Sequence, residues 1–592
     1  HLPIINILQK NGKLNENTPT QYQGLSTSKA REKIKEELEE NNLLIKVESI
    51  IHQVGHGERS GDIVEPMVSK QWFVSTSQMA KVALEAVADG STTFFPKGWE
   101  NTYFAWLKEP KDWCISRQLW WGHQIPVFYC SSCDHQWADE NDAKECVNCT
   151  SSAITQDQDV LDTWFSSGLW PLTTLGWPDK KVMAQKNFDL FYPTQTLVTG
   201  FDIIFFWVAR MMMMCLKETK QVPFSDVYIH AIVRDKQGRK MSKSLGNGIN
   251  PLDLIDQYGT DALRFALASD AGYNRTINLD VDRIEGYRNF MNKLWNAFRF
   301  TEPYLAKAQN SLPPLNELTH QDKWILAELN LVKKTMNEEM EKYRFDEASS
   351  AIYSFVYDKF CSWYIEFSKP IFAAEDDQAA IIRASVLKYV FKEILALLHP
   401  ITPFITEEIW SYLDSEYLIA QKYPEYEEKM NFSDDRTYMN YFIDYITALR
   451  NSRAALNIKP KEEIDTIFYT DNSIIAEYLY QNRVFLHSLA KVKKGAIYAK
   501  STPDRPAKAT LSALEFGELY LLHNFTVDNS AQIQKIEAEL KKMQDELSRV
   551  EQKLGNSSFM EKAPEHVTNE IKNKKIVFVE KIEMLTKQLA SL

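Results

Sequence analysis

Two hydrophobic stripes near the C-terminus constrain the fold more than any other feature of this sequence. In the first stripe apolar residues recur at intervals of three and four residues, at Ile533, Ile536, Leu540, Met543, Leu547, Val550 and Leu554. The second stripe places on one helix face Val567, Ile571, Phe578, Ile582, Leu585, Leu589 and Leu592. Gly555 and Asn556 separate the stripes, and each stripe forms a seam along one helix face. A dimerisation zipper is the alternative. The internal partner favours an antiparallel coiled-coil hairpin with arms of about 33 Å.

Length and charge limit the remaining architecture. A chain of 592 residues is too long for one hydrophobic core, so it should form several domains. With 44% hydrophobic and 25% charged residues it has the composition of an ordinary globular protein. Its net charge of −12 means that a nucleic-acid partner must bind local basic patches rather than an overall positive field.

The sequence predicts no membrane span and no signal peptide. The most apolar run, from Phe201 to Leu216, contains Asp202 and Arg210 and fits a buried amphipathic helix better than a bilayer span. Four of the seven cysteines are clustered and the others are scattered, unlike a secreted disulfide framework. We therefore expect a cytoplasmic protein, and the initial His1 suggests a fragment.

The first half mixes strands and helices. The segment from Thr27 to Asn42 predicts a helix for which Ser28 is a plausible N-cap. Residues 71–265 alternate strands with helices, the pattern of an open, mostly parallel sheet. Within them, the pattern predicts a strand leading into a turn over 187–199, a helix over 202–216 and a buried strand over 227–233.

Long amphipathic helices dominate the sequence after about residue 320. Helical spacing relates Ile325, Leu329, Val332, Met336, Met340 and Tyr343, and similar stripes follow at 352–367 and 382–397. Pro370 and the pair Pro400 and Pro403 should end these helices, which together predict a bundle. Residues 461–527 are interpreted as a small connecting module, with Pro503 and Pro506 in a linker.

Four cysteines form two CxxC knuckles in a turn-rich segment, Cys130, Cys133, Cys146 and Cys149. Each knuckle brings two thiolates to one side of a tight turn, and two knuckles complete a tetrahedron around Zn²⁺. A redox pair would need only one knuckle. The sequence therefore predicts a structural zinc ribbon, stabilised on the order of 10 kcal/mol by the metal.

The segment from Asp235 to Asn247 has the composition of a polyphosphate-binding loop. It combines lysines that neutralise charge, serine hydroxyls that donate hydrogen bonds, and glycines that let the backbone approach a ligand. A solvated basic turn is the alternative for an arbitrary run of this composition.

The pentapeptide Lys240-Met-Ser-Lys-Ser244, followed by Leu-Gly-Asn247, resembles the KMSKS signature of class I aminoacyl-tRNA synthetases. The resemblance implies a mobile loop that stabilises the triphosphate of ATP, bound with Mg²⁺, while an amino acid attacks the α-phosphate. Lys243 would contact the transition state, Lys240 would assist it, and Ser242 and Ser244 would bind the nucleotide. Positioning and charge stabilisation supply most of the catalysis in such chemistry.

Three further segments resemble the valyl, isoleucyl and leucyl members of this class. They are 113–126, Asp159-Val-Leu-Asp-Thr-Trp-Phe-Ser-Ser-Gly168 and Gly200-Phe-Asp-Ile-Ile-Phe-Phe-Trp-Val-Ala-Arg210, and the last two match the valyl member best. A C-terminal arm is typical of valyl enzymes, and 559–564 resembles its turn. The isoleucyl alternative would be favoured by a C-terminal zinc site instead.

The resemblance implies a multidomain protein of α/β and all-α parts. Its expected divisions are an editing-domain tail (1–70), the second half of a Rossmann catalytic domain (71–265) with a zinc ribbon (126–155) and a KMSKS loop (235–250), a stem-contact region (266–319), a helical anticodon-binding domain (320–460), a connecting module (461–527) and a coiled-coil arm (528–592).

The motifs also imply site residues. Trp164 and Trp207 would wall the side-chain pocket for valine, with Ile203 one helical turn before Trp207. His230 and Asp235 flank the strand entering the loop and are candidates for ATP contacts. A structural histidine is the alternative for His230, because Ala231 replaces the glycine that often follows it in the family.

The family's other signature, His-x-Gly-His, is missing. His52-Gln-Val-Gly-His56 has one residue too many between its histidines, and its surroundings resemble the exit of the editing insertion. We therefore expect the first Rossmann half to lie upstream of His1 and the chain alone to be inactive. Editing is needed because a valine pocket rejects threonine only by roughly 100-fold, a value already established for enzymes of this family.

The resemblance thus implies the reaction of the valyl family, in which valyl-adenylate forms from valine and ATP and valine is transferred to tRNA(Val), with the protein acting as a monomer. The alternative from another functional class is a catalytically incomplete tRNA-binding protein. Arg450 and Arg453 lie near the end of the bundle as possible RNA contacts, although a solvated helix face accounts for them equally well.

Overall fold

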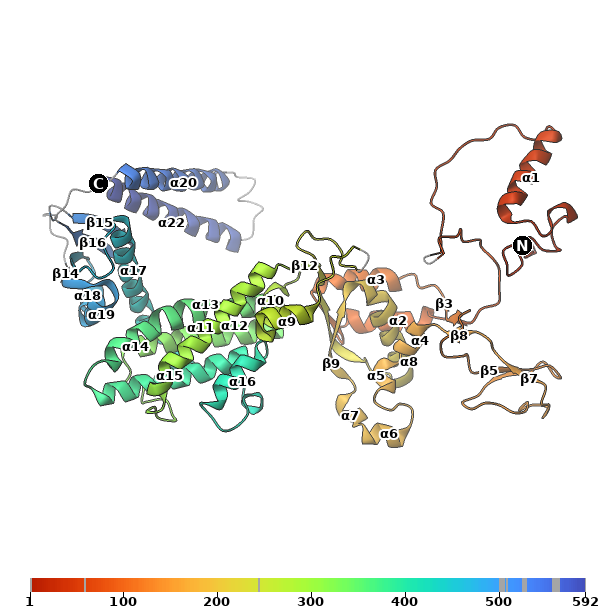
Figure 1. Ribbon diagram of the computed structural model, residues 1–592, viewed down its shortest axis with the longest axis horizontal. Helices are drawn as coiled ribbons and strands as arrows, with labels where there is room; N and C mark the ends of the chain where they lie inside the picture. Colours follow the sequence, from red (N-terminus) through yellow and green to blue (C-terminus); the bar gives the residue numbers. More distant parts are fainter. Residues whose placement is uncertain are drawn as a thin grey trace. The chain divides into compact units, whose positions relative to one another are not determined.

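The computed structural model divides into two compact units, 1–227 and 228–592 (Figure 1). It describes residues 3–57, 60–242, 245–499, 506, 509–523, 530–555 and 565–590. Each unit has its own secondary structure and its own buried side chains.

The first unit consists of short strands and short to medium helices. In chain order these are η1 (Thr20–Tyr22), α1 (Thr27–Glu40), β1 (Phe73–Val74), α2 (Ser77–Ala88), β2 (Thr93–Phe95), η2 (Lys97–Trp99), α3 (Glu100–Leu107), β3 (Trp113–Cys114), β4 (Ser116–Arg117), β5 (Val127–Cys130), β6 (Gln136–Ala138), β7 (Ile154–Gln156), β8 (Val160–Leu161), α4 (Thr163–Ser167), α5 (Trp170–Thr173), α6 (Lys180–Gln185), α7 (Phe188–Phe191), β9 (Thr194–Gly200), η3 (Phe201–Ile203), η4 (Ile204–Ala209) and α8 (Arg210–Thr219).

The expected single sheet over 71–265 is divided into smaller pieces. Strand β10 (Phe224–His230) lies between β2 and β9 in a three-stranded sheet, whereas β1–β3 and β4–β8 are separate antiparallel pairs. Three strands, β6-β5-β7, build the cysteine-rich module. The strands of these two pairs have two residues each, fewer than the usual three to ten, and each pairs with a single neighbour.

Two local predictions in this unit were wrong. The N-cap of α1 is Ser26, whose side chain accepts a hydrogen bond from the Lys29 amide, so Ser28 lies inside the helix. The stretch read as strand to turn begins with α7 and enters β9 only at Thr194.

The predicted helix 202–216 is present as three consecutive segments of different helix type. A 3₁₀ turn, η3, leads into the π-helical segment η4 and then into α8. Met211, Met212 and Met213 are buried on α8, which packs against α2. The helix therefore belongs to the core, as its apolar character indicates.

The second unit is mostly helical. After β11 (Ile232–Arg234) it contains α9 (Pro251–Tyr258), α10 (Thr260–Asp270), β12 (Thr276–Asn278), α11 (Val281–Leu305), α12 (His320–Glu341), α13 (Phe345–Ser354), η5 (Phe355–Tyr364), α14 (Ile365–Phe372), α15 (Asp377–Leu398), α16 (Pro403–Ser411), η6 (Leu418–Ala420), η7 (Glu428–Met430), α17 (Ser433–Ala455), β13 (Ile464–Tyr469), α18 (Ser473–Gln481), α19 (Val484–Ala490), β14 (Val492–Tyr498), β15 (Ala509–Leu514), β16 (Gly517–Leu522), α20 (Ser530–Leu554) and α22 (Glu565–Ala590).

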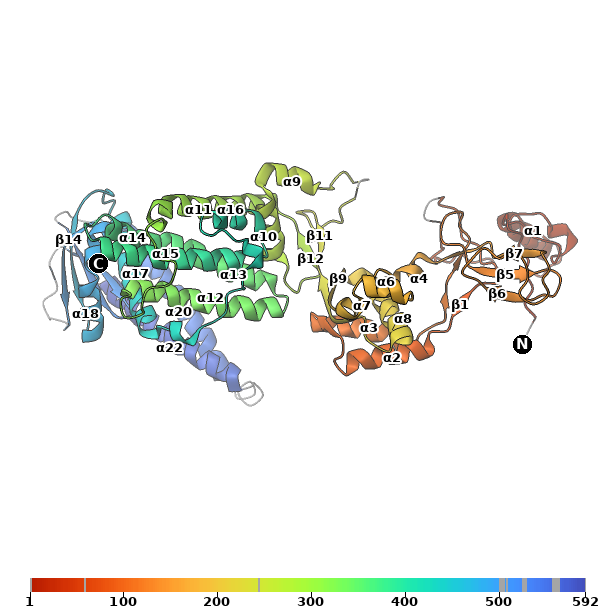
Figure 2. The same ribbon diagram turned by 90° about the horizontal axis from the view of Figure 1, so that it is seen from below.

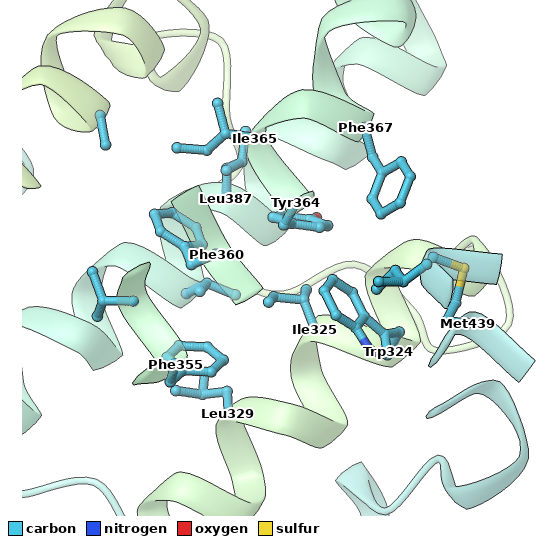
Figure 3. Close-up of a cluster of buried hydrophobic side chains, with 14 of the residues drawn as sticks. Trp324, Ile325, Leu329, Phe355, Phe360, Tyr364, Ile365, Phe367, Leu387 and Met439 are labelled. Carbon is cyan, nitrogen blue, oxygen red and sulfur yellow. The ribbon is translucent and has the colours of Figure 1, made fainter. Parts of the chain in front are cut away.

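Helices α11, α12, α13 and α15 form the bundle (Figure 2). Trp324, Ile325 and Leu329 project from α12 toward Phe360 and Leu387 in its core (Figure 3). Trp324, Ile325, Phe360 and Leu387 are fully buried. The helical spacing in the sequence therefore identified the correct face of α12.

Prolines affect the bundle in two ways. Pro400 and Pro403 separate α15 from α16, as predicted, and Pro403 is the first residue of α16. Pro370 does not end a helix where predicted, because it lies within α14, two residues before the helix ends at Phe372. Only the last turn follows it, so little hydrogen bonding is lost.

A small mixed sheet follows the bundle. Its strand order is β14-β13-β16-β15, with β13–β14 parallel and the other pairs antiparallel. Its core continues that of the bundle through Phe468, Leu519 and Leu521. Pro506 lies in irregular structure, whereas Pro503 lies outside the described residues.

The two C-terminal helices, α20 and α22, lie side by side (Figures 1 and 2). Lys575 Nζ lies 2.9 Å from Glu551 Oε1, and Lys581 Nζ lies 3.3 Å from Glu539 Oε1. Because the pairing partners move backward along α20 as they advance along α22, the helices are antiparallel. Leu585 of α22 is buried, with 4% of its surface exposed.

Among the residues that the structure describes, no helix is both long enough and apolar enough to cross a membrane.

Candidate functional site

One buried carboxylate organises the loop after β11. Asp235 is only 5% exposed, and its Oδ1 accepts hydrogen bonds from the amides of Gln237 (3.1 Å) and Arg239 (2.7 Å). Its Oδ2 accepts from Arg239 Nε at 2.8 Å and Asn247 Nδ2 at 3.0 Å. The Asn247 amide and Arg239 hold the pKa of Asp235 down at about 2, so this carboxyl is ionised at neutral pH.

Asn247 joins the two sides of the same loop. Its Nδ2 also donates to the Lys240 carbonyl at 3.2 Å, while its Oδ1 accepts from the Ser242 amide at 3.0 Å. Ser242 Oγ accepts from the Leu245 amide at 3.2 Å. In the sequence Asn247 is recognised only as part of the motif, and its role in the loop was not predicted, although a side-chain amide at the end of a glycine-rich loop is a common turn signal.

The predicted ATP residues lie on this loop or just before it. Lys240 is exposed, and Lys243 and Ser244 lie outside the described residues. His230 is partly buried at the end of β10, with Nδ1 2.9 Å from the Ala231 carbonyl oxygen. Its ATP contact, like those of the loop residues, stays a prediction.

The predicted amino-acid pocket residues come from three elements of the first unit. Trp164 is on α4, Ile203 ends η3 and Trp207 is in η4, and all three are partly buried. Trp164 stacks on Phe206, whereas Trp207 Nε1 donates to the Ser167 carbonyl at 3.2 Å. Helix α4 and η4 pack together, so the motif residues are neighbours in space.

An ionic cluster around the buried Asp162 carboxylate holds α4 at its start. Asp162 Oδ2 accepts hydrogen bonds from Trp113 Nε1 (3.0 Å), Arg117 Nη2 (3.0 Å) and Arg210 Nη1 (3.4 Å). Its Oδ1 caps α4 by accepting from the Trp164 amide at 3.3 Å. The Arg210 guanidinium also lies 3.8 Å from the Trp113 ring centroid, and burial lowers its pKa. Sequence analysis missed this cluster because its members are far apart in the chain.

The four clustered cysteines converge on one point. Their sulfur atoms all lie within 4.8 Å of one another, with Cys130–Cys149 at 3.6 Å and Cys133–Cys146 at 3.7 Å. At a Zn–S distance of about 2.3 Å, the sulfurs of a tetrahedral site are about 3.8 Å apart. The donor set therefore fits a zinc ion.

The two knuckles repeat one hydrogen-bond pattern. The amides of Ser132 and Asn148 donate to the sulfurs of Cys130 and Cys146, each at 3.4 Å. Asp134 and Thr150, one residue beyond the knuckles, adopt positive φ angles of 56° and 57°. These turns point backbone amides at sulfur, as thiolate ligands require.

Thiol pKa values in the cluster diverge. A side-chain hydrogen bond from Asn148 lowers the pKa of Cys133 to about 6. For Cys149, a hydrogen bond from the Ser151 amide lowers the pKa, but hydrogen bonds shared with Cys133 and Cys130 outweigh it and raise the pKa to about 12. Four thiolates so close together need a cation to be stable at once, which again fits a metal centre.

The two arginines near the end of the bundle make structural contacts. Arg453 is buried and donates to the carbonyls of Ala490 (3.3 Å) and Lys459 (2.7 Å), which fastens α17 to the following module. Arg450 lies over the Trp363 ring and donates to the Leu489 carbonyl at 3.2 Å. Neither residue is on a fully solvated helix face.

Comparison with protein families covers most of the chain. Residues 21–280 match the family model of class I tRNA synthetases (I, L, M and V), residues 322–468 the anticodon-binding domain of tRNA ligases, and residues 528–592 the tRNA-binding arm of valyl-tRNA synthetases.

Curated relatives are named valine–tRNA ligase. That of Clostridium acetobutylicum is 41% identical over 579 residues, covering 96% of this chain and 64% of its own length. That of Clostridium perfringens is 39% identical over 595 residues, covering 100% of this chain and 67% of its own length. This chain thus spans slightly less than two thirds of the first relative and 67% of the second.

A solved structure, Mycobacterium tuberculosis methionyl-tRNA synthetase bound by methionyl-adenylate, matches with a TM-score of 0.48 and 18% identity, covering 65% of this chain and 70% of that one. The family model of the valyl arm and the long alignments to valine–tRNA ligases agree with the KMSKS-like loop and the tryptophan motifs. The chain belongs to the valyl-tRNA synthetase family of class I aminoacyl-tRNA synthetases.

Proposed function

We propose that this chain serves in a valine–tRNA ligase, which activates valine with ATP to valyl-adenylate and transfers it to tRNA(Val). The observation that carries the proposal is the ordered loop around Asp235 and Asn247, which presents Lys240 to solvent in a member of the valyl family. A loop that is held at its base and carries an exposed lysine is suited to a polyphosphate ligand.

Within the loop, Lys240 and Lys243 would stabilise the charge that develops as the α-phosphate is attacked. Ser242, Ser244 and His230 would bind the nucleotide, which arrives with Mg²⁺ on its phosphate oxygens. Because both lysines are point charges on flexible stems, they can follow the pyrophosphate as it leaves.

Valine would be recognised by shape. Trp164, Ile203 and Trp207 supply flat and branched apolar surfaces, and a branched aliphatic side chain offers a site little besides shape. The Asp162 cluster supports this assignment, because a rigid α4 keeps the Trp164 ring from adapting to other amino acids.

The cysteine module would hold a structural zinc ion through Cys130, Cys133, Cys146 and Cys149. All four ligand positions are thiolates, so the site leaves no open position for catalysis. Its role would be to fold the small ribbon 126–155, where strands of only three or four residues bury little apolar surface.

The remaining regions would bind tRNA, with the divisions given above. The bundle 320–460 would bind the anticodon, 266–319 would contact the tRNA stem, and the helical pair of 528–592 would act as an antiparallel coiled-coil arm. Unpaired anticodon bases would be read by stacking and edge contacts. The protein would act as a monomer.

The decisive experiment is amino-acid-dependent ATP–pyrophosphate exchange with valine, isoleucine and leucine. It should use a version that includes any residues encoded upstream of His1, since the relatives are longer. Preferential exchange with valine supports the proposal, while preference for isoleucine contradicts the assignment of the pocket. Release of threonine from mischarged tRNA(Val) would test the editing step separately.

A second candidate function is tRNA binding without amino-acid activation by the chain alone. The coverage of only 64% of the first relative favours it, together with two tRNA-binding family models in one chain. Salt-sensitive tRNA binding without exchange would be its signature.

A further inference from the structure

The two ends of the KMSKS-like loop meet at a single pair of side chains. Asp235 leaves β11 and Asn247 precedes α9, yet Asn247 Nδ2 lies 3.0 Å from Asp235 Oδ2. The contact closes the loop at its base. Lys240 and Ser242 are on the enclosed segment and bond to Asn247 through backbone groups.

Both side chains are fully engaged in this role. Asp235 accepts four hydrogen bonds, all from residues of its own loop. Asn247 uses its amide nitrogen twice and its oxygen once. A carboxylate that is 5% exposed and turned toward the loop backbone has little capacity left for a ligand.

We propose that Asp235 and Asn247 form a latch that fixes the shape of the loop carrying Lys240, and that Asp235 acts by positioning the loop rather than by contacting the nucleotide. This inference rests on the proposed function for its kinetic consequence. The latch itself is a structural feature of this chain, so it can be tested without measuring catalysis.

Chemistry explains why an acid and an amide are paired. Only an ionised carboxylate can accept from two backbone amides, a guanidinium and a side-chain amide at the same time. Only an amide side chain can donate to both Asp235 and the Lys240 carbonyl while accepting from the Ser242 amide. Asp235→Asn alone places two amide donors opposite each other, and Asn247→Asp alone places two carboxylate acceptors opposite each other. The double exchange again pairs one donor with one acceptor at the contact between positions 235 and 247.

The test is a double-mutant cycle with Asp235→Asn, Asn247→Asp and the two combined. Each single variant should lower kcat/KM for ATP in valine-dependent exchange by about 10- to 100-fold, with KM for valine unchanged. The double exchange should recover part of that loss, though not all, because a carboxylate at position 247 cannot donate to the Lys240 carbonyl.

A matched control lies a few residues further along. Asn250 Nδ2 donates to Asp253 Oδ1 at 2.9 Å, a second amide–carboxylate pair at the start of α9. Asp253→Asn should leave the ATP parameters unchanged. Thermal unfolding of all variants separates loop effects from global destabilisation.

An activity-independent readout completes the test. Tryptic cleavage after Arg239 or Lys240, followed by mass spectrometry on this chain, should accelerate in both single variants and slow again in the double variant. If exchange is silent in the version that includes the residues encoded upstream of His1 but cleavage follows this order, the latch stands and the proposed function fails. Additive single effects without rescue, or cleavage rates equal to the wild type, would overturn the latch.

Discussion

Arg383 and Asp322 face each other inside the helical bundle, with Nε 2.8 Å from Oδ1 and both side chains only 1% exposed. Tyr364 OH donates to the same carboxylate at 2.6 Å, and Asp322 completes a capping box with Thr319 at the start of α12. A pair so deeply buried is costly to break, because the remaining charge cannot reach water.

We expect Arg383→Met to destabilise the bundle by about 3–5 kcal/mol, since Asp322 would stay buried without its cation. Urea unfolding followed by helical circular dichroism should show a clearly lower midpoint. The midpoint is the appropriate quantity because a multidomain chain does not unfold in two states.

The exposed pair Arg299–Glu302, at 2.9 Å, provides the control. Arg299→Met should change the stability by no more than about 1 kcal/mol. Equal effects of the two substitutions would show that burial does not determine the cost.

Cys133→Ser should abolish metal binding by the cysteine module, because a tetrahedral site needs all four thiolates. Elemental analysis of the purified chain should find about one zinc per wild-type molecule and almost none in the variant. Cys361→Ser, distant in the sequence and part of the other compact unit, should retain the metal. Zinc retained in Cys133→Ser would refute the assignment.

Trp164→Ala and Trp207→Ala should each raise KM for valine in the exchange reaction, with KM for ATP little changed. Loss of an apolar wall weakens contact with a branched aliphatic substrate by about 1–3 kcal/mol, or roughly 10- to 100-fold. Trp137→Leu, on ribbon strand β6, should leave KM for valine at its wild-type value. An unaltered KM in both pocket variants would exclude these residues from the valine site.

Sequence patterns predicted those parts of the fold that depend on neighbours along the chain. The helix spacing around Trp324 and the paired knuckles at Cys130 and Cys146 are local, so their periodicity or spacing is enough. The cap of α1 was misplaced by two residues, because Ser26 and Ser28 are both good caps and only the backbone conformation decides between them.

Contacts between distant segments could not be predicted in the same way. The Asp162 carboxylate could be placed in a motif, but its bonds to Arg117 and Arg210 depend on how β4, α4 and α8 pack. Arg453 looked like an RNA contact or a solvated residue, and it is instead buried against carbonyls of the next module. Charge alone does not reveal such a partner.

Tyr445 should make the stability of the bundle fall at alkaline pH. Burial raises the pKa of its phenol to about 12, against about 10 in an unfolded chain. The neutral phenol is therefore favoured in the folded state, so its contribution is fully present below about pH 10 and is lost as pH rises to about 12. Tyr445→Phe should flatten the decline of the urea midpoint over that range, whereas exposed Tyr417→Phe should not.

The helical pair α20–α22 offers a test of the arm on one helix. Leu585 is 4% exposed and Ile576 is 56% exposed, although both are large aliphatic residues of α22. Leu585→Asp places a charge at a buried position of α22 and should destabilise the packing of this helix, while Ile576→Asp should be tolerated. If the pair is one of several tRNA-binding modules, as proposed, its loss should weaken binding of tRNA(Val) by about 10- to 100-fold, measured by fluorescence anisotropy at fixed salt. If Leu585→Asp lowers the helical signal but leaves affinity intact, the pair folds as described and does not contribute to RNA binding. If Ile576→Asp alone weakens binding, the exposed face of α22 contacts RNA directly.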